Sequence, residues 1–512
     1  MMNDATPHLI QHASATPDRP AVIMTGDGAV MTYAALEARS HALAGQLAAR
    51  GIEREDHVAI LMENRADFMV AVWAAQRAGL YFTPVNWHLT ADEIGYIVQD
   101  CGARAILSSD DRVAALVPVA AKCPTVAIWL CDRGGPSGFA PALGEMPMPI
   151  VYDSVEGSSM IYSSGTSGRP KGIKRMISGA PFGQLGAGDQ MLRGLYAWDA
   201  DTVFLDPSPL YHAGPLNFAM STHRAGGTVV LMRDFDPVEA LAAIQAHRVN
   251  KAWLVPTMMI RMLKVADRAR YDVGSMTHAV HSAAPCPRDT KRAMIEWWGP
   301  VLYEFYAATE GNGLTAITPH EWLTHPGSVG RSPDVRIVGE DGEVLSAGEI
   351  GVIYFASSWT QFEYHNDPAK TAEAHDRNGW TTIGDMGYLD DEGYLYLTDR
   401  KTNMIIAGGV NIYPQEAENV LAVHPAVEDV AVIGVPHPEY GEEVKAVVQL
   451  GAGQVASDAL VDALISHCQS QLAKYKCPRS VDFVDALPRM PNGKLLKREL
   501  RARYWSDQKL RI

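Results

Sequence analysis

The stretch "YSSGTSGRPKG" (residues 162–172) consists almost entirely of small and polar residues, with two cations near its end. A loop binds phosphate when backbone N–H groups converge and no Cβ blocks the approach, and Gly165, Gly168 and Gly172 permit that geometry. Serine and threonine hydroxyls add donors, and Lys171 adds a positive charge for phosphate oxygens. Because arginine and proline precede Lys171 here, the spacing does not match the P-loop of ATPases and kinases. Taken alone, the stretch is either a solvated linker or a loop that holds phosphate.

Apolar runs and helical patterns alternate on both sides of this stretch. Residues 57–62 predict a strand and residues 66–79 a helix, while 227–232 and 251–255 predict two further strands. Between the last two, the Asp-Pro pair at 236–237 marks a helix start, because Asp caps free N–H groups and Pro suits the first helical position. Strands that alternate with helices favour a largely parallel sheet covered by helices.

The pattern changes near residue 385. Residues 384–401 read as short hairpin strands, and they are followed by a predicted helix (413–423), two β-rich runs and a second helix (456–473). We therefore predict a large α/β N-terminal domain of layered parallel sheets with helices (1–399). A joint at 400–403 connects it to a small α+β C-terminal domain of roughly 110 residues (404–512).

Composition narrows the class of protein. The net charge of −15 argues against general affinity for nucleic acid or for an anionic membrane surface. The six cysteines form no CxxC pair, which is typical of reduced thiols in the cytoplasm. The N-terminus has no apolar segment after a basic start, and no window approaches a membrane span. We expect a cytoplasmic protein without a signal peptide or integral membrane segment; whether it is a homodimer stays open.

Three further stretches follow the opening one in order: "YEFYAATEG" (303–311), "TIGDMGYLDDEGYLYLTDRKTNMIIAGGVNIYPQEAENVL" (382–421) and "PNGKLLKREL" (491–500). With "YSSGTSGRPKG", they resemble the ordered signatures of the adenylate-forming superfamily, which includes acyl-CoA synthetases, luciferases and the adenylation domains of peptide synthetases. The resemblance implies two steps. A carboxylate attacks the α-phosphate of ATP to give acyl-AMP and pyrophosphate, and a thiol then displaces AMP. It also implies a small domain that rotates between the steps.

The resemblance assigns nucleotide and metal roles by motif. The β- and γ-phosphates would be held by Ser163, Ser164, Gly165, Thr166, Ser167, Gly168 and Lys171. Tyr306 would lie against adenine, with the backbone of Ala283 and Ala284 at its edge. Thr309 would bond phosphate, and Glu310 would hold Mg²⁺, an ion that proteins often bind through one carboxylate plus substrate phosphates.

Further roles concern the ribose, the reacting carboxylate and the thiol. Asp385 would accept hydrogen bonds from the ribose hydroxyls, and Arg400 would approach the ribose or a phosphate. Lys494 would bridge carboxylate and α-phosphate oxygens during adenylation, and His212 would lie beside the carboxylate. Pantetheine would pass Gly408 and Gly409. Without the resemblance, Asp385 is as well explained as a cap, Arg400 as half of a solvated ion pair, and Lys494 as a turn residue.

Three positions depart from the family's pattern. Ala307 stands where relatives commonly carry glycine after the tyrosine, and its methyl group must be accommodated beside the nucleotide. In the hinge, Thr402 and Asn403 replace the usual charged residues, which weakens the hinge assignment.

The segment "YHAGPLNFAMSTHR" lacks the aspartate with which amino-acid-activating relatives bind the substrate ammonium group. We therefore expect a hydrophobic carboxylic acid that is fatty, alicyclic or aromatic. The candidate lining residues are Leu216, Phe218, Met220, Met258 and Met259, although methionines on a helix are more often plain core. Coenzyme A is the expected acceptor. The alternatives are an acyl carrier protein, a luciferase-like fate for the adenylate, or a nucleotide-binding regulator without catalysis.

Overall fold

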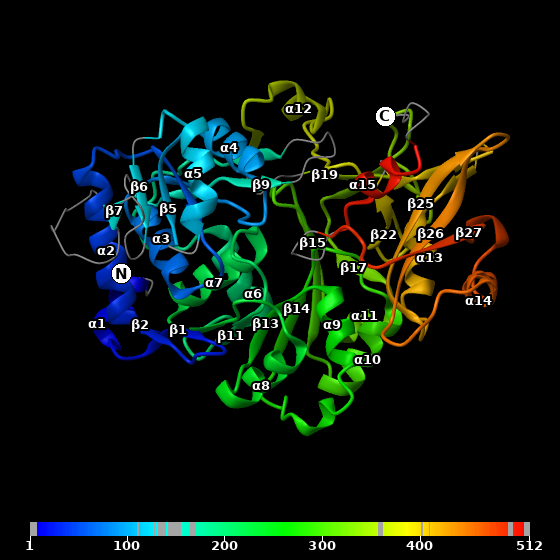
Figure 1. Cartoon of the computed structure of the whole chain (residues 1–512), viewed down its shortest axis with the longest axis horizontal. Helices are drawn as coiled ribbons and strands as arrows, with labels where there is room; N and C mark the ends of the chain where they lie inside the picture. Colours follow the sequence, from blue (N-terminus) through cyan, green and yellow to red (C-terminus); the bar gives the residue numbers. More distant parts are fainter. Residues whose placement is uncertain are drawn as a thin grey trace.

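The computed structural model has two lobes, a large one that ends near Arg400 and a small one at the C-terminus, shown in yellow to red in Figure 1. The residues that the structure describes are 8–109, 112–126, 128–131, 140–141, 155–163, 170–356, 362–400, 403–408, 410–489 and 495–505. Among these residues, no helix combines the length and the apolar character that crossing a membrane requires.

The largest sheet runs through the centre of the large lobe. Its strands are β1 (Pro20–Met24), β2 (Val30–Thr32), β11 (Val203–Asp206), β12 (Thr228–Leu231), β13 (Lys251–Leu254), β14 (His278–His281), β15 (Leu302–Ala307), β16 (Leu314–Ile317), β17 (Ser328–Arg331), β18 (Val335–Val338), β19 (Gly351–Phe355), β21 (Asp385–Leu389) and β22 (Tyr394–Arg400). In space they follow the order β18-β19-β21-β22-β17-β16-β15-β14-β13-β11-β12-β1-β2.

This sheet is parallel in one half and antiparallel in the other. From β1 to β15 the neighbours run parallel, as predicted, because helices connect most of these strands. Beyond β15 the chain turns back through short connections and the pairing becomes antiparallel. The helices of this part are α6 (Ala187–Tyr196), α7 (Ala213–Ala225), α8 (Pro237–His247), α9 (Pro256–Leu263), the 3₁₀ turn η2 (Arg268–Arg270), α10 (Arg288–Trp298) and α11 (Pro319–Thr324).

A second sheet is parallel throughout its described pairs. Its strands are β3 (His57–Leu61), β4 (Tyr81–Pro84), β5 (Ala103–Ser108), β6 (Ile128–Cys131), β7 (Ala140–Pro141) and β8 (Ser158–Ser159), in the order β7-β6-β5-β3-β4-β8. The helices of this region are α1 (Leu9–Ala15), α2 (Tyr33–Ala49), α3 (Ala66–Arg77), α4 (Ala91–Asp100) and α5 (Val113–Lys122). The predicted strand 57–62 and helix 66–79 are confirmed, and each ends one or two residues earlier than expected.

Helix α3 shows how the layers are joined. Every residue from Phe68 to Arg77 is buried, and the helix contacts α2, β1, β3 and β4. A helix that is apolar on all sides cannot face water. α3 is therefore buried between the largest sheet, which contains β1, and the second sheet, which contains β3 and β4.

A small third sheet contains β9 (Ile161–Ser163), β10 (Lys171–Lys174) and β20 (Glu363–Tyr364), and α12 (Pro368–Glu373) follows it. β9 and β10 are antiparallel, with Ser163 opposite Lys171. The predicted phosphate-binding loop therefore connects two paired strands.

The small lobe has its own sheet and its own core. Its elements are β23 (Ile405–Ala407), β24 (Val410–Ile412), α13 (Pro414–Leu421), β25 (Val427–His437), β26 (Gly441–Leu450), α14 (Asp458–Gln469), the 3₁₀ turn η4 (Lys474–Lys476), β27 (Ser480–Val484) and α15 (Lys497–Ala502). The predicted hairpin strands of residues 384–401 are confirmed up to Arg400 as β21 and β22. The helix expected over 456–473 is shorter, because the Ser457 side chain accepts from the Leu460 N–H and caps its start.

Candidate active site

A cleft of about 3490 Å³ is lined by residues from both lobes. Its walls include these predicted site residues: Ser163, Lys171, His212, Ala283, Ala284, Tyr306, Thr309, Glu310 and Asp385. Several other predicted groups lie outside the described residues, namely Ser164, Gly165, Thr166, Ser167, Gly168, Gly409, Lys494 and the side chain of Arg400. The fold thus brings most of the describable candidates to one surface.

Tyr306 and Asp385 are joined directly. The Tyr306 hydroxyl, near the end of β15, donates to Asp385 Oδ2 at 2.9 Å, at the start of β21. Phe355 stacks near the tyrosine ring, with the centroids 6.1 Å apart. A flat aromatic surface and a carboxylate therefore lie side by side, which is the pairing that a base and its ribose require.

Glu310 lies in a turn after β15, and one of its carboxyl oxygens is held by a hydrogen bond. Its Oε1 accepts from the Tyr364 hydroxyl at 2.9 Å, and the carboxyl group is buried in the wall of the cleft. The preceding residue is also anchored, because Arg175 Nη2 donates to the Thr309 carbonyl at 2.6 Å. Burial lowers the pKa of Arg175, and the nearby Glu310 charge opposes that shift.

Lys171 is held at the mouth of the predicted phosphate loop. Its Nζ lies 3.3 Å from Asp367 Oδ2, and Asp367 caps α12 by accepting from the Lys370 N–H. That backbone bond lowers the pKa of Asp367, and the Lys171 charge adds to the shift. This ion pair therefore holds the Lys171 side chain at the wall of the cleft.

Ala283 and Ala284 follow β14 and line the cleft. Ala283 has a φ of 72°, in the left-handed region where a residue with a Cβ loses about 1–2 kcal/mol. Such strain persists only where the surroundings impose it, and it concentrates at binding sites. The turn is thus consistent with a close backbone approach to a flat ligand.

A buried ionic group, of which Glu304 also lines the cleft, supports this wall. Lys291 Nζ lies 2.6 Å from Glu304 Oε2, and His281 Nε2 lies 3.4 Å from the same oxygen. All three side chains are buried, and burial raises the pKa of Glu304 and lowers that of His281. Because Glu304 is two residues before Tyr306 and His281 two before Ala283, the group holds both adjoining strands in place.

His212 is at the N-terminus of α7, and the first turn of that helix follows it along the cleft. The predicted apolar lining is partly wrong. Phe218 and Met258 line the cleft, but Leu216, Met220 and Met259 lie in the core. The periodicity of a helix shows which residues share a face, yet it does not tell which face meets the cavity.

In the small lobe, the described residues next to Lys494 reach the same cleft, since Leu495 and Leu496 line it. Lys497 Nζ lies 2.8 Å from Glu418 Oε1 and 3.9 Å from Asp399 Oδ2, so it links α13 to the end of β22.

Gly408 has a φ of 58° and its N–H donates to the Tyr440 carbonyl at 2.8 Å. Tyr440 lines the cleft, whereas Gly408 does not line it and is hydrogen-bonded to a residue that does.

Sequence reasoning missed Arg175, Tyr364, Glu304 and Lys291. Arg175 had a signal in the sequence, since it lies three residues after Gly172, the last residue of the glycine-rich motif. Tyr364 had none, because 54 residues separate it from Glu310.

Comparison with known proteins gives a consistent result. Residues 9–365 match the family of AMP-binding enzymes, and residues 416–494 match the AMP-binding enzyme C-terminal domain. The chain is 32% identical to the long-chain-fatty-acid–CoA ligase FadD13 of Mycobacterium tuberculosis, over 97% of each chain. It is 30% identical to the fatty acid–[acyl-carrier-protein] ligase ScoC of Streptomyces coeruleorubidus, over 98% of this chain and 96% of that one. Among solved structures, o-succinylbenzoate CoA synthetase (MenE) of Bacillus subtilis, in complex with its acyl-adenylate, is similar with a TM-score of 0.79 and 27% identity, over 97% of this chain and 98% of that one.

Proposed function

Because the chain belongs to the family of AMP-binding enzymes, we propose that it is an acid–thiol ligase. It activates a hydrophobic carboxylic acid with ATP, forms acyl-AMP and pyrophosphate, and transfers the acyl group to coenzyme A. The names of FadD13 and MenE, a CoA ligase and a CoA synthetase, support this reaction.

The observation that carries the proposal is the Tyr306–Asp385 hydrogen bond in a cleft that also contains the buried Glu310. The aromatic ring suits adenine, the carboxylate suits the ribose hydroxyls, and Glu310 follows Tyr306 in the turn after β15. Mg²⁺ prefers one or two carboxylates plus substrate phosphates, so Glu310 is the residue that would hold it and help neutralise the phosphate charge.

The chain's own residues act mainly by positioning and charge. A carboxylate is a poor electrophile, and making its mixed anhydride with AMP provides a good leaving group. Lys171 and the loop at 163–168 hold the phosphates, and His212 orients the attacking carboxylate toward the α-phosphorus. Lys494 from the small domain bridges the two reactants in line. Preorganised charge of this kind is usually the largest single contribution to enzyme catalysis.

We further propose that the domains are 1–399 and 404–512, joined by the hinge 400–403. Rotation there withdraws Lys494 after adenylation and brings Gly408 and Gly409 toward the pantetheine arm of the thiol. Arg400, at the start of the hinge, contacts the ribose or a phosphate. With ATP and CoA as co-substrates, the cytoplasm is the proposed compartment.

A second candidate acceptor is an acyl carrier protein, and the similarity to ScoC favours it. Both reactions share the adenylation step and differ only in the thiol. AMP release on addition of CoA, compared with release on addition of a phosphopantetheinylated carrier protein, distinguishes the two acceptors.

The test is a panel of carboxylic acids with ATP and Mg²⁺, read by pyrophosphate release and by the mass of the thioester. Lys494→Ala should abolish pyrophosphate release and retain much of the reaction from supplied acyl-AMP. Lys122→Ala, at the end of α5 and away from the cleft, is the matched control and should change neither step. No pyrophosphate with any acid refutes the function; equal loss of both steps refutes the role of Lys494.

A further inference from the structure

The cleft continues along α7, well past His212. The residues of α7 that line it include Gly214, Asn217, Ser221 and Arg224, which recur every three or four positions and so share one face. At 1.5 Å per residue, Ser221 lies about 13 Å beyond His212 along the helix axis. The cleft therefore has a far end, distant from the position at which the carboxylate reacts.

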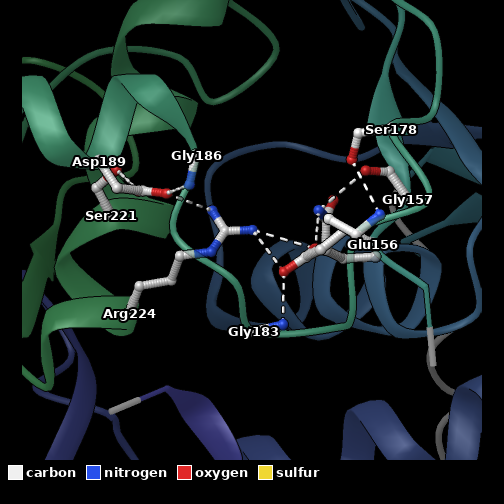
Figure 2. A network of polar contacts seen from close by, with 10 residues as sticks. Glu156, Gly157, Ser178, Gly183, Gly186, Asp189, Ser221 and Arg224 are labelled. Atoms are coloured by element: carbon white, nitrogen blue, oxygen red, sulfur yellow. Dashed lines mark hydrogen bonds and ion pairs between the residues drawn. The ribbon is translucent and has the colours of Figure 1, made fainter. Parts of the chain in front are cut away.

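That far end is polar. Figure 2 shows Arg224 between two carboxylates, Asp189 on α6 and Glu156. Asp189 accepts a hydrogen bond from the Ser221 hydroxyl and another from the Gly186 N–H at 3.0 Å. The guanidinium lies 3.7 Å from Asp189 Oδ2 and 3.3 Å from Glu156 Oε2. We call Asp189, Ser221, Arg224 and Glu156 the polar end cluster.

Burial and charge make this cluster unusual for a purely hydrocarbon site. Each of its four residues is at most 9% exposed. Asp189, Ser221 and Arg224 nevertheless line the cleft. Burying ions is costly, and an alkyl chain end placed against them cannot replace the hydrogen bonds that water would provide. Two carboxylates against one guanidinium also leave one excess negative charge, which disfavours a second carboxylate on the substrate.

The cluster offers both a donor and an acceptor. Among the described residues, Arg224 Nε is buried and has no hydrogen-bond partner. Ser221 donates its proton to Asp189, so its oxygen keeps lone pairs with which to accept. A hydroxyl accepts one hydrogen bond and donates another, whereas an ammonium group only donates and a carbonyl only accepts.

The geometry points to an acid that carries a hydroxyl group at the end remote from its carboxylate, bound by the polar end cluster. This inference rests on the proposed function and narrows its substrate class. The middle of such an acid passes Phe218 and Met258, which supply the apolar part of the lining. Ser221 and Arg224 become specificity-determining residues, since they contact the part of the substrate that does not react.

The experiment compares matched acids by the kcat/KM of pyrophosphate release. One series is decanoate, ω-hydroxydecanoate, ω-aminodecanoate and the corresponding dicarboxylate; a rigid pair is cinnamate and para-hydroxycinnamate. Sites built to bond a hydroxyl reject the analogue without it by large factors, so we expect at least about a tenfold preference for a hydroxylated acid over its parent. Equal use of both, or preference for the amine, the diacid or the parent, overturns the inference while the proposed function stands. Pyrophosphate from no acid at all overturns the proposed function instead.

Ser221→Ala connects the preference to the cluster. We expect it to lower kcat/KM for the favoured hydroxylated acid about tenfold more than for its parent, because only the former loses a hydrogen bond between the substrate and the protein. Use of the parent acid on the same variant shows that the cleft is intact. Ser275→Ala, which removes a hydroxyl away from the cleft, is the matched control and should keep the preference. Equal losses for both acids assign Ser221 a structural role only, and no loss for either acid assigns it no role in activity. Both results overturn the inference.

Discussion

The Asp206→Asn substitution tests how much the buried carboxyl group of Asp206 lowers the free energy of unfolding as the pH rises. Asp206 is the last residue of β11 and is 0% exposed. Its Oδ1 accepts from the Ser208 N–H at 3.3 Å, while Oδ2 has no hydrogen-bond partner among the described residues. Burial raises the pKa of this carboxyl group from 3.8 to about 8, and the Ser208 bond offsets the shift only in part.

The sign and size follow from linkage. Below pH 3.8 the acid is protonated in both the folded and the unfolded chain, so it contributes no pH dependence. Between pH 3.8 and about 8 the unfolded chain ionises while the folded one stays neutral, and stability falls by about 1.4 kcal/mol per pH unit. At pH 7 the loss amounts to about 4 kcal/mol, and above pH 8 it levels off near about 6 kcal/mol. Asparagine has the same shape and does not titrate.

The assay is urea unfolding of the wild-type protein and the Asp206→Asn variant between pH 5 and pH 8. Tryptophan fluorescence reports mainly on the large lobe, because of the 11 tryptophans only Trp505 follows residue 400. We expect the stability advantage of the variant to grow by about 1.4 kcal/mol per pH unit, since groups common to both proteins cancel. Asp201→Asn, an exposed control, should give a constant difference. A constant difference for Asp206→Asn as well would refute the reasoning.

Three further outcomes are expected. Tyr364→Phe removes the hydrogen bond to Glu310 and should lower acid-dependent pyrophosphate release about tenfold, with a raised Mg²⁺ requirement; unchanged activity at limiting Mg²⁺ would contradict this. Lys291→Met leaves Glu304 buried without its cation and should cost about 3–5 kcal/mol in unfolding free energy. That loss should be larger at pH 8 than at pH 5, because burial raises the pKa of Glu304 and protonation relieves the charge. ATP with Mg²⁺ at 100 times its Kd should stabilise the protein by about 2.7 kcal/mol, and Asp385→Asn should lose most of that gain in a thermal shift measurement.

The local features of this protein can be predicted from its sequence. The strands and helices near residues 57–79 and 227–255 follow from apolar periodicity, and the start of α8 follows from Asp236, whose side chain accepts from the Val238 and Glu239 N–H groups. These features depend on neighbours within one turn, so a short window contains all the information they need. The order of the motifs was likewise enough to identify the family.

Contacts between side chains that are distant in the sequence depend on the packing of the whole fold. Tyr306 is hydrogen-bonded to Asp385, 79 residues away in the sequence, and Arg224 to Glu156, 68 residues away. These contacts depend on the order of strands in the sheets and on the packing of layers, which no local pattern encodes. The same holds for the acyl end of the cleft, where two of the five predicted lining residues reach the cavity and a polar cluster appears that the sequence did not suggest. The whole fold determines the partners and the charge state of each buried group. Burial removes the water that would otherwise hydrogen-bond a polar or charged group, so the group needs a partner within the protein or must stay neutral.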